Sequence, residues 1–359
     1  MKPMADYPFY HSHIEISRDV LQSNARYLHR NLKSGTRSVA VIKADAYGHG
    51  AVEVARTVGD LYDMFAVANV TEAVALRKAG ITHPILVFGV PVPQTVAAYP
   101  AYDLEAVVSS DEHFDQLQQG TAYHVEIDSG MGRLGIRPDD LERVRKRIAS
   151  AGRITCKGVM THFASADEGD GVYMQHQIRV LAQIRDMFGG QFPLHAANSA
   201  ASLDHPDTHL DMVRHGIALY GYDPTPEPSE QLRPAMKWRS WVAQCKYIHK
   251  GDSLSYGATW QAPEGGYYAV IPAGYADGYR RNLSGKLPVR IDGRWYPQVG
   301  RVTMDYIMVW LGGDRYAAGT EVLVMGGEKN HAGIMADAIG TIPYEICCGI
   351  HTKVPRRMV

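Results

Sequence analysis

A repeat between residues 39 and 219 limits the fold of this chain more than any other feature, because short apolar runs alternate there with stretches of helical periodicity. Runs that are apolar throughout are typical of parallel strands buried on both faces. The clearest helical stretches are 70–78, 139–150 and 173–188. The apolar runs are 39–42, 64–67, 85–88, 106–108, 123–127, 158–160, 194–197 and 212–219. Eight strand–helix repeats predict an α/β fold with a closed (β/α)8 barrel of the TIM type.

The pattern changes after residue 234, where polar and apolar residues alternate and helical periodicity is nearly absent. This alternation, with turn signals such as Lys250-Gly251-Asp252, predicts an antiparallel β domain. The expected strands are 241–248, 267–271, 288–291, 295–299, 307–311 and 321–324. Three prolines between 223 and 232 discourage regular structure and mark the boundary. We therefore predict a barrel domain over 1–233, opening with a strand at 12–16 and a helix at 18–32, and a mainly antiparallel β domain over 234–359.

Charge and composition favour a small-molecule substrate. The 359 residues include 37 Lys and Arg and 38 Asp and Glu, a net charge of −1, so nothing favours nucleic acid or an anionic membrane. Residues 1–10 lack the apolar core of a secretory signal and no run is long enough to span a bilayer, so a cytoplasmic location is the default expectation. The cysteines and histidines show no zinc-binding spacing, so no metal is expected.

Lys43 stands where the first apolar run meets its loop, in the stretch Ala-Val-Ile-Lys-Ala-Asp-Ala-Tyr-Gly-His-Gly from Ala40 to Gly50. Burial at such a point would lower the pKa of the ammonium group and expose an amine that can form an imine with an aldehyde. The more ordinary alternative is a lysine that extends along the strand end into water. Periodicity alone favours the lysine that extends into water.

Other polar residues stand at the carboxyl ends of the predicted strands, where barrel enzymes place their chemistry. They follow the sixth, seventh and eighth apolar runs, and Lys43 follows the first. These residues are His162, Asn198, Ser199, Arg214, His215 and Gly216. Each alone could be an ordinary hydrogen-bonded residue at a barrel rim. Their occurrence on four strands predicts a shared site.

The stretch Ala40–Gly50 is very similar to the segment of alanine racemases, a fold type III family, that attaches pyridoxal 5'-phosphate (PLP). The resemblance implies that Lys43 carries PLP covalently and that Tyr47 reaches the cofactor phosphate. Matching segments continue through the chain as far as Thr-Ile-Pro-Tyr-Glu, which contains Tyr344. The family therefore provides an expectation for each of the polar residues above.

The resemblance implies a PLP-binding set that is not confined to Lys43. Arg214, in Met-Val-Arg-His-Gly, matches the family arginine that donates to the pyridine nitrogen. Because a guanidinium keeps its protons, this nitrogen should stay unprotonated, and the weaker electron sink favours racemisation over transamination. The remaining members, chiefly for the phosphate, are Tyr47, His162, Asn198, Ser199, the backbone N–H groups of Gly216 and Ile217, and Tyr344.

Racemisation needs a proton donor and acceptor on each face of the substrate, and Lys43 serves one face only. Tyr256, in Leu-Ser-Tyr-Gly-Ala-Thr-Trp, matches the second catalytic residue of the family, which reaches the active site of the partner in a homodimer. A tyrosine is a poor base at neutral pH unless it is tuned, and the family arrangement implies tuning by His162 and Arg214. Without the motif, Tyr256 would be an ordinary aromatic residue in a turn.

The resemblance also implies a substrate-binding set. Arg133, in Asp-Ser-Gly-Met-Gly-Arg-Leu-Gly, matches an arginine that contacts the substrate carboxylate. Many relatives have a carbamylated lysine seven positions earlier, where this chain has Glu126, so we expect Glu126 to pair with Arg133 without a carbamate. The other residues expected at the substrate are Tyr275, Met304 and Asp305. A narrow pocket walled by tyrosines suits alanine, with serine as a weaker substrate.

The resulting expectation is a homodimeric, PLP-dependent racemase with shared active sites that interconverts L- and D-alanine and supplies D-alanine for peptidoglycan. One alternative is a serine or broad-specificity racemase. A second is an amino-acid decarboxylase of similar architecture, which Arg214 disfavours because decarboxylation gains from a protonated pyridine. A third is a PLP carrier protein, whose relatives lack the second domain that holds Tyr256.

Overall fold

The computed structural model describes residues 11–168 and 171–359. Contacts divide the chain into two compact units. One comprises Leu21–Ala46 and Gly50–Arg233, and the other comprises the described residues up to Val20 together with Tyr47–His49 and Pro234–Val359. Each unit is described by itself.

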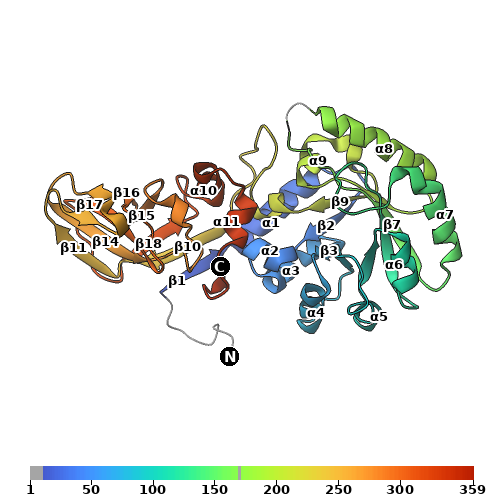
Figure 1. Cartoon of the computed structure of the whole chain (residues 1–359), viewed down its shortest axis with the longest axis horizontal. Helices are drawn as coiled ribbons and strands as arrows, with labels where there is room; N and C mark the ends of the chain where they lie inside the picture. The colour runs from blue at the N-terminus through green and yellow to red at the C-terminus, as the bar shows by residue number, and fades with distance from the viewer. Residues whose placement is uncertain (1–10, 169–170) are drawn as a thin grey trace. The chain divides into compact units, whose positions relative to one another are not determined.

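The first unit is built on a closed barrel of eight parallel strands, which confirms the predicted (β/α)8 architecture (Figure 1). The last strand pairs with the first, with Arg37 opposite Met212, and this pairing closes the barrel. The strands are β2 (Arg37–Val41), β3 (Met64–Val67), β4 (Ile85–Val87), β5 (Glu105–Val108), β6 (Ala122–Glu126), β7 (Thr155–Met160), β8 (Leu194–His195) and β9 (Met212–His215). Closure explains why β3 and β4 are buried at every residue.

Helices precede the first barrel strand and connect the strands to one another. They are α1 (Arg18–Arg30), α2 (Lys43–Gly48), α3 (Ala51–Val58), α4 (Val70–Lys78), α5 (Ala98–Ala101), α6 (Asp111–Gln116), α7 (Leu141–Ser150), α8 (Val172–Phe188) and α9 (Ser199–Asp204). Helix α4 illustrates why the sequence forms them: the Asn69 side chain caps its first turn, and Ala73 and Leu76 bury one face.

The last apolar run was expected to be one strand over 212–219, but β9 ends at His215. Gly216 leaves the strand conformation with φ −102° and ψ −107°, and Ile217–Tyr220 form a 3₁₀ turn. All four turn residues are buried, so the run is apolar for its whole length although its backbone changes direction. This turn returns the chain toward β2, because the Tyr220 hydroxyl donates to the Val41 carbonyl at 2.9 Å.

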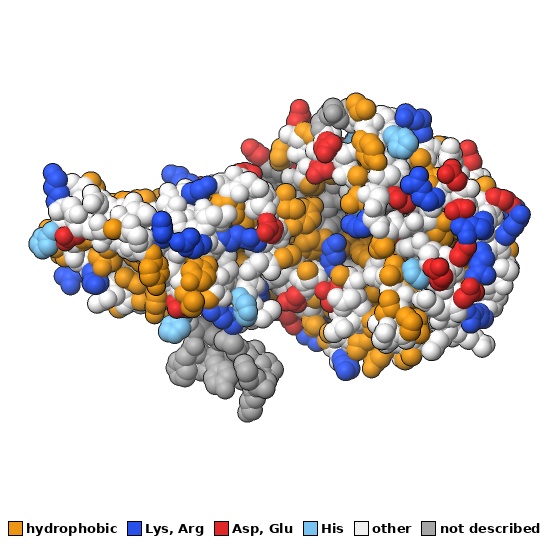
Figure 2. Space-filling view, in the orientation of Figure 1, with side chains coloured by type: hydrophobic (Ala, Val, Ile, Leu, Met, Phe, Trp, Pro, Cys, Tyr) orange, Lys and Arg blue, Asp and Glu red, His pale blue; other side chains and the backbone are white. Residues whose placement is uncertain are grey.

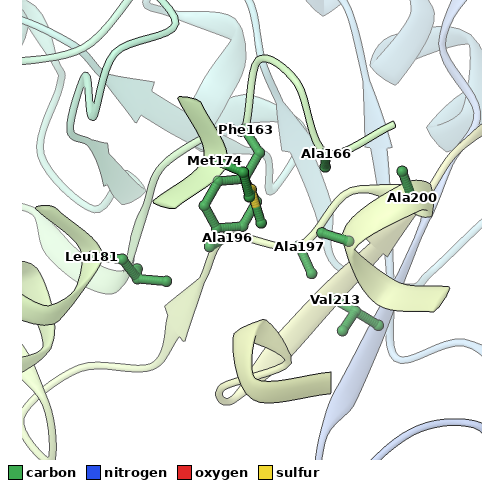
Figure 3. Close-up of a cluster of buried hydrophobic side chains, with 9 residues drawn as sticks. Phe163, Ala166, Met174, Leu181, Ala196, Ala197, Ala200 and Val213 are labelled. Atoms are coloured by element: carbon green, nitrogen blue, oxygen red, sulfur yellow. The ribbon is translucent and has the colours of Figure 1, made fainter. Parts of the chain in front are cut away.

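Helices α8 and α9 pack against the segments that follow β7 and β8. Their shared core is a cluster of buried apolar side chains shown in Figure 3. Its members are Phe163, Ala166, Met174, Leu181, Ala196, Ala197, Ala200, Ala201 and Val213. Because Phe163 follows His162 and Ala197 precedes Asn198, burial of this cluster fixes the loops that carry both polar residues.

The second unit contains a nine-stranded, mostly antiparallel sheet in the order β11-β14-β17-β16-β15-β18-β10-β1-β19. The bounds are β1 (Ser12–Ile16), β10 (Met236–Trp241), β11 (Gln244–Ile248), β14 (Gly266–Pro272), β15 (Pro288–Ile291), β16 (Arg294–Val299), β17 (Tyr306–Gly312), β18 (Glu321–Met325) and β19 (Arg356–Met358). Strand β1 pairs with β10 and β19, although the sequence analysis assigned it to the barrel domain. Its hydrogen-bond partners lie more than 200 residues further along the chain, so local pattern could not reveal them.

Two further differences from expectation occur in this unit. The single strand expected over 241–248 is two strands, because the chain turns between Trp241 and Gln244. The unit also contains two helices, α10 (Ala332–Ile339) and α11 (Pro343–Cys348), that were not predicted. Both are too short to show clear periodicity, although a left-handed glycine ends α10 and Pro343 begins α11, as is usual at helix ends.

Figure 2 shows acidic and basic side chains interspersed on the visible face of the barrel unit, with neither sign forming a continuous patch. Within residues 11–168 and 171–359, no helix has the length and apolar character needed to cross a membrane.

Candidate active site

A cavity of about 220 Å³ opens at the carboxyl ends of the barrel strands. Its walls come from the ends of β2, β3, β4, β6 and β7 and from the loop after β6. The lining residues are Lys43, Ala68, Phe88, Gly89, Glu126, Arg133, Leu134, Met160 and His162. Four residues singled out in the sequence therefore meet around one cavity, namely Lys43, Glu126, Arg133 and His162.

Lys43 is held by an unusual backbone conformation. It begins α2, whose next four residues all have φ between 52° and 54°, the left-handed region. These residues are Ala44, Asp45, Ala46 and Tyr47. A left-handed turn costs about 1–2 kcal/mol for each residue that is not glycine, so the surrounding structure must enforce it.

The Glu72 carboxylate is one of the groups that enforce this turn. One of its oxygens accepts from the Ala44 N–H group at 2.8 Å, and the other accepts from the Ala68 N–H group at 2.8 Å. Ala44 follows Lys43, and Ala68 follows β3 and lines the cavity. Glu72 was not among the predicted site residues; its signal in the sequence is its place three residues after the capping Asn69.

Replacing Glu72 with alanine should lower the free energy of unfolding by about 1–3 kcal/mol, because two backbone N–H groups lose their acceptor. Chemical denaturation would measure the change. The matched control is Thr71→Ala at the exposed neighbouring position, which should stay within about 0.5 kcal/mol of wild type. Equal stability of the Glu72 and Thr71 variants would contradict the assigned role.

His162 and Arg214 form a hydrogen-bonded pair beside the cavity. Arg214 Nη2 donates to His162 Nδ1 at 3.1 Å and also to the carbonyls of Thr161 and Ala196, at 2.8 and 2.9 Å. Burial, followed by the charges of Arg214, Arg133 and Lys43, lowers the pKa of His162 to about 3. Burial also lowers the pKa of Arg214, to about 10, which leaves it charged at neutral pH. The pair is therefore a neutral imidazole held by a cation.

Glu126 does not form the expected ion pair with Arg133 within the described residues. Its Oε2 atom accepts from the Ser109 hydroxyl at 3.1 Å instead. Burial raises the pKa of Glu126, and the Ser109 hydrogen bond and the charges of Arg133 and Arg214 oppose this rise. Because Arg133 is solvent-exposed on its loop while Glu126 is buried in β6, the two interact only as charges at longer range.

Ser199, Gly216 and Ala218 form a second cluster, outside the lining of the cavity, and Ile217 lies between the last two in the chain. The N–H groups of Gly216 and Ala218 both donate to Ser199 Oγ, at 2.9 and 3.3 Å. Amides that converge on one point form an anion-binding nest. Asn198 immediately precedes α9, and its side-chain oxygen caps this helix by accepting from the Ala201 N–H group at 3.0 Å.

The remaining candidate residues belong to the second unit. The rings of Tyr47 and Tyr344 pack at a tilt, with centroids 5.7 Å apart, and burial raises the pKa of Tyr47. Tyr256 lies between β12 (Ser253–Leu254) and β13 (Trp260–Gln261) and is 65% exposed.

Tyr275 and Met304 are brought together by backbone hydrogen bonds. The Tyr275 N–H group donates to the Thr303 carbonyl and the Ala276 N–H group to the Met304 carbonyl, both at 3.0 Å. Gly274 permits this approach, because a Cβ atom there would overlap the Met304 carbonyl. Tyr275, Met304 and Asp305 are all exposed at the surface of this unit.

A metal site was not expected. Among residues 11–168 and 171–359, no group of three or more His, Cys, Asp or Glu side chains is arranged to hold a metal ion.

Comparisons with known proteins agree with these features. The family model "Alanine racemase, N-terminal domain" matches residues 16–224, and "Alanine racemase, C-terminal domain" matches residues 235–358. A curated alanine racemase of Desulfovibrio desulfuricans is 39% identical over 360 residues, covering 95% of this chain and 96% of the relative. A solved alanine racemase of Clostridium difficile has a TM-score of 0.91 at 34% identity, covering 98% of this chain and 96% of that one. Another, of Bacillus anthracis with bound L-Ala-P, has a TM-score of 0.88 at 35% identity, with coverages of 98% and 96%. The chain belongs to the alanine racemase family.

Proposed function

We propose that this protein is a PLP-dependent alanine racemase that uses Lys43 and the Tyr256 of the partner subunit as its two bases. The observation that carries the proposal is the cavity at the end of β2, where Lys43 meets the hydrogen-bonded pair of His162 and Arg214. The names of the relatives support alanine as the substrate. A role in supplying D-alanine for peptidoglycan is part of the same proposal.

The residues present fit PLP. Among the described residues, no acceptor is found for the Arg214 Nε–H group, although the side chain is buried, so this donor is available for a pyridine nitrogen. The amides of Gly216 and Ala218 converge on Ser199 Oγ and offer donors for a phosphate, with Ile217 between them in the chain. Tyr47 and Tyr344 would add hydroxyl groups, and Lys43 would hold the cofactor covalently. When bound, PLP withdraws electrons and so acidifies the α-carbon of an attached amino acid.

The hydrogen bond from Arg214 determines which nitrogen of His162 can donate. Because Arg214 only donates, His162 Nδ1 must accept, and a neutral imidazole then carries its hydrogen on Nε2. An Nε2–H donor backed by a fixed cation stabilises a phenolate that approaches it. In this way His162 and Arg214 would tune the Tyr256 of the partner subunit to accept a proton near neutral pH.

The homodimer with shared active sites is supported by the surface of the second unit. Tyr256 and Met304 are 65% and 52% exposed, and Tyr275 is 41% exposed. Large side chains with this exposure are common at interfaces between subunits. We propose that the domain over 234–359 lends these residues to the active site of the partner, where Arg133, Met304, Tyr275 and Asp305 contact the substrate.

The substrate proposal is tested by incubating the purified holoenzyme with a panel of L-amino acids and separating the products by chiral chromatography. Alanine should be racemised fastest, and serine should be slower, because its hydroxyl needs a partner in a pocket suited to a methyl group. Faster conversion of serine or of a basic amino acid would favour the broad-specificity alternative. Bound PLP without any racemisation would favour a carrier protein.

A further inference from the structure

A line of hydrogen-bonded polar side chains crosses the interior of the barrel and ends at Arg214. His195 Nδ1 lies 3.2 Å from Arg214 Nη1, and His195 Nε2 lies 2.9 Å from His124 Nδ1. His124 Nε2 in turn lies 2.8 Å from Glu105 Oε2. The residues come from four strands, β5, β6, β8 and β9, and Glu105 is the first residue of β5, at the end of the barrel opposite the cavity. We call Glu105, His124 and His195 the relay.

Arg214, at one end of the relay, determines which ring nitrogen of each histidine carries the hydrogen. Arg214 can only donate, so His195 Nδ1 accepts and His195 Nε2 carries the hydrogen. That hydrogen must go to His124 Nδ1, which leaves the His124 hydrogen on Nε2, facing the Glu105 carboxylate. Both histidines are neutral in this arrangement and every ring nitrogen is satisfied. A cation stands at one end and an anion at the other.

Burial keeps water away from the hydrogen bonds of the relay. His124, His195 and Arg214 are each at most 2% exposed, so water does not replace a lost partner. Arg214 has no direct ion pair within the described residues. The relay therefore connects its buried charge to the Glu105 carboxylate, in addition to the longer-range attraction of Glu126.

Gly158 provides the space that the relay needs. A Cβ atom at this position of β7 would lie 2.5 Å from His124 Nδ1 and 3.0 Å from the Pro193 carbonyl. The pairing of β6 with β7 also shifts register between Tyr123 and His124, next to this point. A strand glycine that admits a neighbouring ring is a recognised use of glycine in sheets. The rings of His124 and His195 then cross edge-to-face, with centroids 4.9 Å apart.

We propose that Glu105, His124 and His195 are positioning residues, which hold the Arg214 guanidinium in the one orientation that presents a donor to the pyridine nitrogen of PLP and to His162. The inference rests on the proposed function, because it assigns these residues to the same site. None of the three contacts the cavity or the reacting atoms. They act through Arg214, which cannot turn without breaking the bond to His195.

The direct test is ¹⁵N NMR of the holoenzyme labelled at its histidine ring nitrogens. The signals of His124 and His195 are assigned from the variants His124→Gln and His195→Gln. Both residues should be neutral with the hydrogen on Nε2. A hydrogen on His195 Nδ1 would overturn the proposal, because Nδ1 could then not accept from Arg214. This readout does not depend on turnover.

Two pairs of variants test whether the relay affects turnover and the spectrum of bound PLP. Gly158→Ala should push His124 away from His195, lower kcat about tenfold, leave KM nearly unchanged and change the visible spectrum of bound PLP. Gly152→Ala is the matched control, since a Cβ atom there meets nothing within 4 Å. Glu105→Leu should lower kcat about tenfold, whereas Glu105→Gln, which keeps an oxygen to accept from His124, should restore most of it.

Equal kcat and equal spectra for Glu105→Leu and wild type would overturn the proposal, even if Gly158→Ala fails to fold. An enzyme that binds PLP but does not racemise alanine would contradict the proposed function alone. In that case the ring tautomers and the spectrum of bound PLP still decide whether the relay positions Arg214.

Discussion

Replacing Lys43 with alanine should abolish covalent attachment of PLP and reduce racemisation by more than about 10⁴-fold, the largest effect expected of any single substitution. Both consequences follow from the position of Lys43, the residue that begins α2 at the end of β2 and lines the cavity. Among the residues that the structure describes, no other lysine lines this cavity and could provide a substitute amine there. The visible absorbance of the purified protein and a coupled assay for D-alanine would measure the two losses.

The matched control is Lys78→Ala, which removes an exposed lysine at the end of α4. This variant should keep its colour and its activity. A Lys43→Ala protein that retains the visible absorbance would show that another residue attaches the cofactor.

Replacing Tyr256 with phenylalanine should leave PLP covalently attached and lower racemisation by about 10²–10⁴-fold, because one face of the substrate loses its proton donor and acceptor. The side chain is 65% exposed in its own unit, so the loss of its hydroxyl should not affect folding. Visible absorbance would report cofactor attachment, and the rate of D-alanine formation would report the chemistry.

Tyr247→Phe is the matched control, since this tyrosine belongs to the same unit and is 53% exposed. It should racemise alanine as fast as wild type. Normal turnover by Tyr256→Phe would refute the two-base scheme while leaving the role of Lys43 intact.

The barrel could be predicted from the sequence because most residues of its strands are buried, so each strand contains or borders a short, mainly apolar run. The position of Lys43 followed from the same pattern, since the run over 39–42 ends one residue before it. The two parts of the candidate site that lie after β7 and β8 were also visible as polar residues at strand ends. The local sequence pattern was sufficient to predict features that depend on one strand and the loop that follows it.

Features that depend on distant partners were not predictable. The left-handed turn of α2 has no glycine before Gly48, and it depends on Glu72, which lies 28 residues from Ala44. Strand β1 finds its place in the second sheet through pairs such as Ile14 with Arg356. In each case the decisive contact joins residues that no local pattern connects.

The relay inside the barrel also could not be predicted from local sequence pattern. His124 and His195 are polar residues within otherwise apolar strands, which alone suggests only that each is hydrogen-bonded. Their direct bond spans 71 residues of sequence. The expected pairing of Glu126 with Arg133 was wrong for a related reason, because the buried Glu126 takes Ser109 as its partner while Arg133 stays exposed.

The central claim is that Lys43 of one subunit and Tyr256 of its partner act on the same substrate. Mixing the Lys43→Ala and Tyr256→Phe proteins after reversible dissociation tests it most directly. A heterodimer would then contain one site with both residues and one with neither, so an equal mixture should recover about a quarter of the wild-type activity. If each site used Lys43 and Tyr256 from the same chain, every site in the mixture would lack one of them. Failure to recover activity from a mixture shown to contain heterodimers would contradict the account.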